Sequence, residues 1–282
     1  MLGHKLVQQL GKSVETWASV RTSFDEVERF GIFDRRRTIE GLDATDLSSI
    51  RNAIETVGPD VVVNAVGVIK RLPVSKDVVN TLQINSIFPQ QLGVLSREIG
   101  FRLIQISTDC VFDGKKGNYT ESDDANALDL YGRSKNLGEV LGANCLTLRT
   151  SIIGRELDTH HSLIEWFLSN RAGKINGFVN AIYSGFPTVV FADIISNLIS
   201  EHKDLNGIFH VSSDPINKFR LLNLVNDHFG AGITIEPVED FMVDRSLDST
   251  KFRNATGFSP QTWEKMIASM ASDATPYDKW RQ

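Results

Sequence analysis

The sequence predicts an α/β fold, a doubly wound parallel sheet with helices on both faces and a smaller C-terminal subdomain. Through the first 150 residues, short apolar runs alternate with amphipathic stretches, as strands and crossover helices do in such sheets. The three valines at 61–63 form a continuous apolar run, which is typical of a parallel strand covered on both faces. The last third has proline and glycine between short elements, which indicates a more irregular unit over the sheet's edge.

The individual elements follow in order along the chain. The opening stretch MLGHKLVQQL predicts a helix from Leu2 to about Leu10. Buried strands are expected at the short apolar runs 14–20, 60–66, 101–106 and 145–149. Helices are expected at 46–57, 74–99, 131–142, 160–172, 191–202 and 218–229. The closing stretch ASDATPYDKWRQ is polar, and we expect it to lie at the periphery.

Gly3 stands at the start of the first predicted helix. In a dinucleotide-binding fold, the first strand runs into a glycine-rich turn, whose third glycine lets the next helix pack closely on that strand. Gly3 fits this third glycine and is a candidate cofactor-binding residue, although the sequence shows neither the strand nor the first two glycines. Without that central strand, buried backbone groups would lack partners. We therefore expect Met1 to be an internal methionine, or the chain to be a fragment; alternatively, Gly3 is a flexible terminal residue.

Composition and charge argue against several classes of function. The 282 residues, 41% hydrophobic and 23% charged, suit one large globular domain or two coupled ones. A formal net charge of −5 argues against nucleic acid or an anionic membrane as a partner. No apolar run reaches the length of a membrane span, and the start lacks a secretory signal. Cys110 and Cys145 form no CxxC motif and have no histidine at ligand spacing, so we expect no metal site and a cytoplasmic location.

Tyr131 and Lys135 are the strongest candidates for chemistry. They lie four residues apart in YGRSKNLGE, so a helix brings them to one face. A tyrosine has an ordinary pKa of about 10, and a nearby ammonium lowers that value, so the pair can exchange a proton with a carbonyl or alcohol oxygen. Thr108 follows a predicted strand in ISTDCVFDG, at the edge where open α/β sheets bind ligands. Its hydroxyl could hold the same substrate oxygen.

These motifs together resemble one family. STDCVFDG, GNYTESD and YGRSKNLGE are similar to the core of the extended short-chain dehydrogenase/reductases, and specifically of the dTDP-4-dehydrorhamnose reductase family. VVVNAVG resembles its strand-four cofactor motif, and LDATDLSS resembles the segment that meets the adenine. GFPTVVFADI, GIFHVSS, LDSTKF and GFSPQTW resemble its C-terminal landmarks, so the likeness runs from Gly3 to about Met266. The motifs are specific in combination rather than singly.

The resemblance implies an architecture and an activity. A Rossmann-like dinucleotide-binding domain, truncated at its N-terminus, would comprise residues 1–152 plus about 177–212. A substrate-binding subdomain would comprise about 153–176 plus 213–282. The implied activity is the NADPH-dependent reduction of a nucleotide-linked 4-keto-6-deoxy sugar, in surface polysaccharide biosynthesis. The partner would be the nucleotide sugar, and a homodimer is a further expectation.

The resemblance also implies roles for individual residues. Thr108, Tyr131 and Lys135 match the family's catalytic triad. Tyr131 would donate a proton to the keto oxygen, Thr108 would position the carbonyl, and Lys135 would tune Tyr131 and bind the nicotinamide ribose. Asp43 matches the residue that recognises the adenine amino group, and Asn85 matches an asparagine that we expect to be structural. The loop along the cofactor is matched by Ala65, Val66 and Gly67.

The choice of cofactor is predicted from the end of the second strand. An acidic residue there favours NAD through the ribose hydroxyl, whereas an arginine accommodates the 2′-phosphate of NADP. Here the strand ends with Ser19, Val20 and Arg21 and has no acid at its tip. The sequence therefore favours NADPH, and NADH remains the alternative if Arg21 is only a solvated surface charge.

Two alternatives to a reductase stay open. An epimerase of the same superfamily can use the same tyrosine and lysine, whereas a dehydratase is disfavoured because Asp109 is followed by Cys110 and not by glutamate. Cys110 also stands where the family usually has tyrosine, so the identity of the sugar is open. A non-catalytic regulatory subunit would suit an incomplete cofactor loop. The intact set of Thr108, Tyr131 and Lys135 argues against a non-catalytic subunit.

Overall fold

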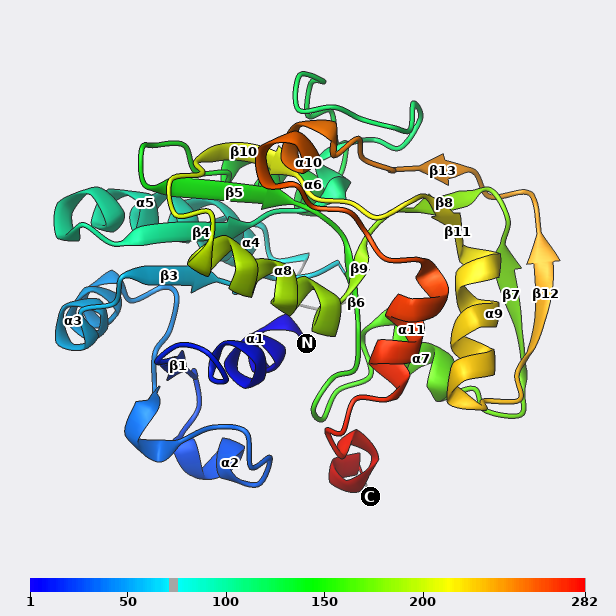
Figure 1. The fold of residues 1–282 in the computed structure, drawn as a ribbon, viewed down its shortest axis with the longest axis horizontal. Coiled ribbons are helices and arrows are strands. Elements are labelled where there is room, and N and C mark those ends of the chain that lie inside the picture. Colours follow the sequence, from blue (N-terminus) through cyan, green and yellow to red (C-terminus); the bar gives the residue numbers. More distant parts are fainter. Residues whose placement is uncertain (71–75, 282) are drawn as a thin grey trace.

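The computed structural model describes residues 1–70 and 76–281. Figure 1 shows a parallel sheet with helices on both faces and a second group of strands and helices at one side. The helices are α1 (Leu2–Leu10), α2 (Phe24–Glu28), α3 (Leu47–Val57), α4 (Val78–Leu82), α5 (Phe88–Ile99), α6 (Leu130–Leu137), α7 (Leu163–Leu168), α8 (Thr188–Ser200), α9 (Lys218–Phe229), α10 (Thr250–Thr256) and α11 (Trp263–Ala271). The strands are β1 (Ala18–Ser19), β2 (Thr38–Ile39), β3 (Val61–Asn64), β4 (Arg102–Ile106), β5 (Cys145–Arg149), β6 (Ile152–Ile153), β7 (Lys174–Phe178), β8 (Ala181–Tyr183), β9 (Phe186–Pro187), β10 (Gly207–His210), β11 (Ile216–Asn217), β12 (Thr234–Val238) and β13 (Val243–Asp244).

The main sheet has four parallel strands in the order β10-β5-β4-β3. Alternate side chains of these strands enter two separate cores. Ile104 and Leu146 belong to the core that contains the apolar faces of α1 and α8. Leu103 and Cys145 belong to the core that contains those of α3 and α5. Burial on both faces explains why these strands are mostly apolar, and the predicted α/β class is confirmed.

The strand predicted at 14–20 is much shorter in the structure. It is reduced to β1, which pairs in parallel with β2 and forms a two-stranded sheet of its own. In the described part of the chain, neither strand pairs with the main sheet, in which β3 is an edge strand. Figure 1 shows the pair below β3 and beside α1. The sheet is therefore divided into two pieces at this place.

Helix α1 forms where the sequence predicts it and has two partners. Its leucines belong to the core shared with α8. On another side, His4 Nε2 lies 2.9 Å from the Tyr277 hydroxyl, and Lys5 Nζ lies 2.8 Å from Thr275 Oγ1 and 2.5 Å from an Asp273 carboxylate oxygen. The closing polar stretch is mostly exposed or half-buried, as expected of a peripheral segment, but its polar side chains pair with those buried on α1.

The helix predicted at 74–99 is divided in the structure. Positions 74 and 75 lie outside the described residues. From there on, α4 is followed by a π-helical turn, η3 (Gln83–Ile87), and then by α5. Asn85 is completely buried within this turn. π-Helical turns are rare and often lie at functional sites.

Two other helices are shorter than predicted. α6 ends at Leu137 and not at residue 142. Beyond it, the chain passes so close to η3 that a β-carbon on Gly138 would stand 1.9 Å from the carbonyl oxygen of Asn85. α7 occupies only the middle of the range predicted at 160–172. Periodicity marks the apolar face of a helix, but the ends depend on such close contacts.

The remaining elements form the second group of strands and helices. β7 pairs with β12, and β8 lies between β11 and β13. Helices α9 and α11 pack against each other, and their buried residues Leu221, Val225, Met266 and Ile267 belong to the same core as α1 and α8. One hydrophobic core thus continues from the main sheet into this group, and the predicted division into two units stays a prediction.

Candidate active site

Helix α6 carries two of the three candidate catalytic residues. It is N-capped by Asp129, whose carboxylate accepts a hydrogen bond from the Gly132 backbone N–H at 2.9 Å. Gly132 lies against the short 3₁₀ turn η4 (Asp109–Val111), because a β-carbon there would stand 2.1 Å from the carbonyl oxygen of Cys110. Only glycine permits this approach, so α6 lies directly against the turn that follows β4.

Thr108 and Tyr131 meet at this contact. Thr108 caps η4, since its hydroxyl oxygen accepts a hydrogen bond from the Cys110 backbone N–H at 3.1 Å. The Thr108 hydroxyl lies close enough to that of Tyr131 to lower the pKa of the phenol, an effect that burial outweighs. Thr108 is buried and Tyr131 is half-buried. The structure thus brings two hydroxyls together at the end of β4, as binding of one carbonyl oxygen requires.

Lys135 lies one turn further along α6, and its ammonium also reaches the end of β4. Nζ donates a hydrogen bond to the Ile106 carbonyl oxygen at 2.7 Å. Burial lowers the pKa of Lys135 to about 8, and the negative charge of Glu139 acts in the opposite direction. A β-carbon on Gly67 would stand 3.9 Å from Nζ. Lys135 and the loop after β3 therefore border the same space.

The hydroxyl of Tyr131 is held in its neutral form. Burial raises its pKa above the ordinary value, and the nearby groups Cys110, Asp109 and Asp129 raise it further. The lowering expected from the ammonium of Lys135 does not outweigh these effects, and that ammonium donates its hydrogen bond to the backbone carbonyl of Ile106. Tyr131 therefore keeps its proton at neutral pH, which is the form that can donate one.

The loop at 65–67 is exposed and follows β3 directly. Asn85 binds the residue that follows this loop. Its Oδ1 accepts a hydrogen bond from the backbone N–H of Val68 at 2.8 Å, and its Nδ2 donates one to the Val68 carbonyl oxygen at 3.0 Å. The same amide nitrogen donates to Ser134 Oγ of α6 at 3.2 Å. A β-carbon on Gly67 would stand 3.4 Å from Asn85 Oδ1. Asn85 thus fixes the loop against α6, a structural arrangement consistent with the role expected for it.

The three remaining cofactor candidates lie in the first 43 residues. Hydrogen bonds from Thr45 lower the pKa of Asp43, and the positive charge of Arg21 adds to this effect, so Arg21 and Asp43 are neighbours. Gly3 is exposed in the first turn of α1, and a β-carbon there would meet no atom within 4 Å. The close packing expected at Gly3 is therefore absent from the described structure, and its role in cofactor binding stays a prediction.

Sequence reasoning missed a buried ionic network behind the candidate catalytic residues. Glu139 accepts hydrogen bonds from Nε and Nη2 of Arg149, each at 2.7 Å. Nη1 of Arg149 lies 3.3 Å from His210 Nε2, and all three side chains are buried. They come from three separate parts of the chain, so no spacing in the sequence connects them. The one available signal was the glutamate that ends the motif YGRSKNLGE.

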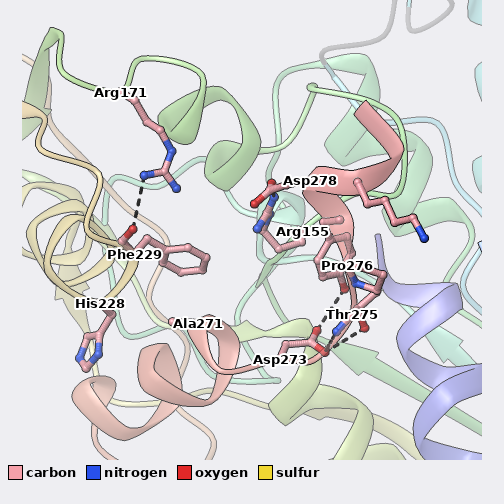
Figure 2. Close-up of a pocket in the computed structure, with 11 residues that line it drawn as sticks. Arg155, Arg171, His228, Phe229, Ala271, Asp273, Thr275, Pro276 and Asp278 are labelled. Atoms are coloured by element: carbon pink, nitrogen blue, oxygen red, sulfur yellow. Dashed lines mark hydrogen bonds and ion pairs between the residues drawn. The ribbon is translucent and has the colours of Figure 1, made fainter. Parts of the chain in front are cut away.

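A cavity of about 420 Å³ lies apart from these residues (Figure 2). The ends of α9 and α11, two arginines and the segment 273–279 line it. Arg155 is paired with Glu165 at 2.7 Å and with Asp278 at 2.5 Å. Because its buried arginine is already neutralised and no candidate catalytic residue lines it, we do not assign a ligand to this cavity.

Three properties of the described residues bear on other classes of function. Cys110 and Cys145 are free thiols. Within residues 1–70 and 76–281, no group of three or more His, Cys, Asp or Glu side chains is placed to hold a metal ion. None of the helices in these ranges is both long enough and apolar enough to span a membrane.

A parallel sheet with a threonine after one strand and a tyrosine–lysine pair on the following helix defines a Rossmann-type α/β protein of the dehydrogenase/reductase kind. Comparison with known families makes this more specific. The chain belongs to the RmlD substrate binding domain family, which matches residues 1–275. The family predicted from the motifs is thereby confirmed.

Several known proteins resemble the chain over most of its length. The dTDP-4-dehydrorhamnose reductase of Aggregatibacter actinomycetemcomitans is 24% identical over 257 residues, which cover 83% of this chain and 87% of that protein. A hypothetical dTDP-4-dehydrorhamnose reductase from Sulfolobus tokodaii has a TM-score of 0.75 at 25% identity, covering 93% and 94% of the two chains. The dTDP-4-dehydrorhamnose reductase of Bacillus anthracis str. Ames, in complex with NADP, has a TM-score of 0.73 at 20% identity, covering 92% and 99%.

A protein named as a subunit and not as a reductase is also similar to the chain. The methionine adenosyltransferase 2 subunit beta of Danio rerio is 30% identical over 199 residues. These residues cover 65% of this chain and 60% of that protein. Proteins similar to this chain thus include some named as enzymes and one named as a subunit.

Proposed function

We propose that this protein is an NADPH-dependent reductase of a nucleotide-linked 4-keto-6-deoxy sugar, acting in surface polysaccharide biosynthesis. Its similarity to proteins named dTDP-4-dehydrorhamnose reductase supports the substrate class. The observation that carries the proposal is the contact between Thr108 and Tyr131 at the end of β4, with the Lys135 ammonium one helical turn away. A pure binding module has no use for this arrangement.

The proposed chemistry assigns one task to each of the three side chains. The hydroxyls of Thr108 and Tyr131 bind the keto oxygen of the sugar. The bound nicotinamide supplies a hydride to the carbonyl carbon. Tyr131 gives its proton to the oxygen, so that the carbonyl becomes an alcohol and a phenolate remains on Tyr131. The positive charge of Lys135 stabilises this phenolate and binds the nicotinamide ribose.

The residues present fit a dinucleotide at the positions that the motifs predict. The exposed loop 65–67 borders the same space as Lys135, since a β-carbon on Gly67 would be in ordinary contact with Asn85 Oδ1 at 3.4 Å and with the ammonium nitrogen at 3.9 Å. Arg21 and Asp43 are neighbours. At the adenosine end of the dinucleotide, Arg21 would bind the 2′-phosphate and Asp43 would bind the adenine amino group. An arginine follows strand β1, and no acidic residue stands at the strand's end. This combination supports NADPH over NADH. Gly3 would contribute at the start of α1.

The experiment that tests this proposal follows NADPH and sugar together. A dTDP-linked 4-keto-6-deoxy sugar should be reduced with one NADPH oxidised per sugar consumed. An epimerase would change the sugar without net oxidation of NADPH, so this outcome would replace the reductase by the epimerase alternative. No change in either compound, with a panel of nucleotide-linked keto sugars, would contradict both enzymatic assignments.

A regulatory subunit is the second candidate, favoured by the similarity to a protein named as a methionine adenosyltransferase subunit. Capture of one stoichiometric partner from the host, together with no oxidation of NADPH on any keto sugar, would favour it. We also propose a cytoplasmic location, supported by the two free cysteines. The homodimer expected from the family likeness is a proposal that the native mass in solution would test.

A further inference from the structure

We propose that Glu139 is a positioning residue of the reductase site, which fixes the end of β4 through Ser107 and helps keep Lys135 positively charged. The inference rests on the proposed function, because it assumes that Thr108, Tyr131 and Lys135 form the site. It goes beyond that function by assigning a role to the buried network behind these residues.

The contacts of Glu139 reach directly behind the catalytic residues. Oε1 accepts a hydrogen bond from Ser107 Oγ at 2.7 Å and one from Arg149 Nε at 2.7 Å. Oε2 accepts from Arg149 Nη2 at 2.7 Å. Glu139 is 9% exposed and Arg149 is 5% exposed. The carboxylate is therefore buried and its geometry is fixed by three hydrogen bonds.

Ser107 connects this carboxylate to the catalytic residues. It lies between Ile106, whose carbonyl oxygen binds Lys135 Nζ, and Thr108, whose hydroxyl lies near that of Tyr131. Its backbone N–H is bonded to the carbonyl oxygen of Leu148, so the β4 ladder holds its backbone while Glu139 holds its side chain. Any shift of Ser107 would move its two neighbours.

The charge of Glu139 acts on Lys135 as well. Lys135 is buried, and burial lowers its pKa to about 8, whereas Glu139 is the charged group that raises it. On the far side of Glu139 lies Arg149 from β5, beside His210 from β10. Burial and the charge of Arg149 lower the pKa of His210 to about 4, so this imidazole is neutral at physiological pH. The pair Lys70–Asp129, joined at 2.6 Å, faces the ring of Tyr131 from the other side.

Stability alone does not explain this network. A buried ion pair is often no more stabilising than apolar residues of similar size. The pair of Arg155 with Glu165 is equally buried and has the same 2.7 Å geometry, yet it lies away from the catalytic residues, beside the cavity in Figure 2. It is therefore a matched control for the proposal.

The test compares Glu139→Gln with Glu165→Gln. Each change keeps the size of the side chain and removes one buried charge. We expect Glu139→Gln to move the alkaline limb of the kcat/KM profile to lower pH by about one unit, since Lys135 loses the charge that favours its ammonium form. Glu165→Gln should lower stability without moving the profile. Superposition of the Glu139→Gln profile on that of the unmodified protein would overturn the charge role.

Two further measurements keep the proposal testable. If Glu139→Gln fails to fold, the double variant Glu139→Gln with Arg149→Gln removes both charges. A smaller shift to lower pH is then expected, because the loss of the Arg149 cation partly offsets the loss of the Glu139 charge. Ser107→Ala should lower kcat at least about tenfold with an unchanged pH profile, because misplacement of reacting groups is costly; an unchanged kcat would overturn the positioning role.

The failure of the proposed function can be told apart from the failure of this inference. Carbon-13 NMR of labelled lysine, assigned with Lys135→Arg, reports the pKa of Lys135 without any substrate. A lower pKa in Glu139→Gln supports the charge role even if no keto sugar is reduced. An unchanged pKa would reject it even in an active reductase.

Discussion

The neutral hydroxyl of Tyr131 is the residue-scale feature that most directly limits the chemistry. We expect Tyr131→Phe to lower kcat by about 10²-fold or more, because it removes the group that protonates the keto oxygen. Binding of NADPH should change little, since the phenol ring and its packing remain. Steady-state oxidation of NADPH and its binding measured by fluorescence would check both parts.

Lys135→Ala provides the contrast to that variant. It removes the charge proposed to stabilise the phenolate and to bind the ribose, so turnover and NADPH affinity should fall together. If Tyr131→Phe retained substantial activity on the substrate, the assignment of Tyr131 as the proton donor would be wrong.

Arg21 is the residue that we propose to set the choice between NADPH and NADH. Its guanidinium is exposed and is placed beside Asp43. Arg21→Ala should weaken NADPH binding about tenfold or more and leave NADH nearly unchanged, because a charge-assisted contact to phosphate is lost only in NADPH. The ratio of the two dissociation constants is the measurement. Equal losses for both cofactors would exclude the 2′-phosphate contact.

The candidate site could be predicted from sequence only where its residues lie close along the chain. Tyr131 and Lys135 are four residues apart, and Thr108 follows an apolar strand, so a helix and a strand end identified them. Glu139 and Arg149 were beyond reach, because their pairing depends on how α6 meets β5 in three dimensions. The raised pKa of Tyr131 was also missed, because burial outweighs the expected effect of the lysine.

At the scale of elements, the close contact of α6 with η4 controls the geometry of the site. Gly132→Ala would place a methyl group 2.1 Å from a backbone carbonyl oxygen, which requires α6 to move. We expect a loss of about 3 kcal/mol in the free energy of unfolding, near the upper end for overpacking, and a large loss of activity. Urea unfolding and steady-state kinetics would measure both.

Gly3→Ala is the matched change on another helix. A β-carbon there meets nothing within 4 Å, so alanine should stabilise α1 by up to about 1 kcal/mol through helix propensity. Weaker NADPH binding in this variant would support the predicted role of Gly3 at the cofactor. A destabilised Gly3→Ala with an unaffected Gly132→Ala would contradict the packing of both helices.

The elements themselves were predicted with their type but not their ends. Apolar periodicity located α1, α3, α8 and α9 well. It could not divide the helix predicted at 74–99, because one extra residue in a π turn leaves the apolar pattern on either side intact. It also overestimated β1, whose length depends on pairing with β2 and not on its own composition.

At the scale of the whole molecule, two buried histidines make stability depend on pH. Burial lowers the pKa of His4 to about 3 and that of His210 to about 4. Below pH 6.5, which is about the ordinary pKa of histidine, the unfolded chain protonates these two imidazoles, whereas the folded chain keeps them neutral. Stability should therefore be full above pH 6.5 and fall as pH decreases, by about 2 kcal/mol per histidine at pH 5.

Unfolding in urea at pH 7 and pH 5 would measure this dependence. His4→Gln should show a smaller loss between the two values, because one of the two groups no longer titrates. His228→Gln changes an exposed imidazole and should leave the loss unchanged. An equal loss in His4→Gln and the unmodified protein would mean that His4 is not buried in its neutral form.

The arrangement of α1 has a consequence for how the protein is made. Its leucine face packs with α8, and Lys5 binds Thr275, 270 positions further along the chain. A ribosome therefore synthesises α1 well before α8 and long before residues 273–277. Through most of translation, the leucines of α1 have no native surface to cover them, which is the condition under which nascent chains aggregate. Productive synthesis should therefore depend on chaperones that shield α1 until residues 273–277 emerge.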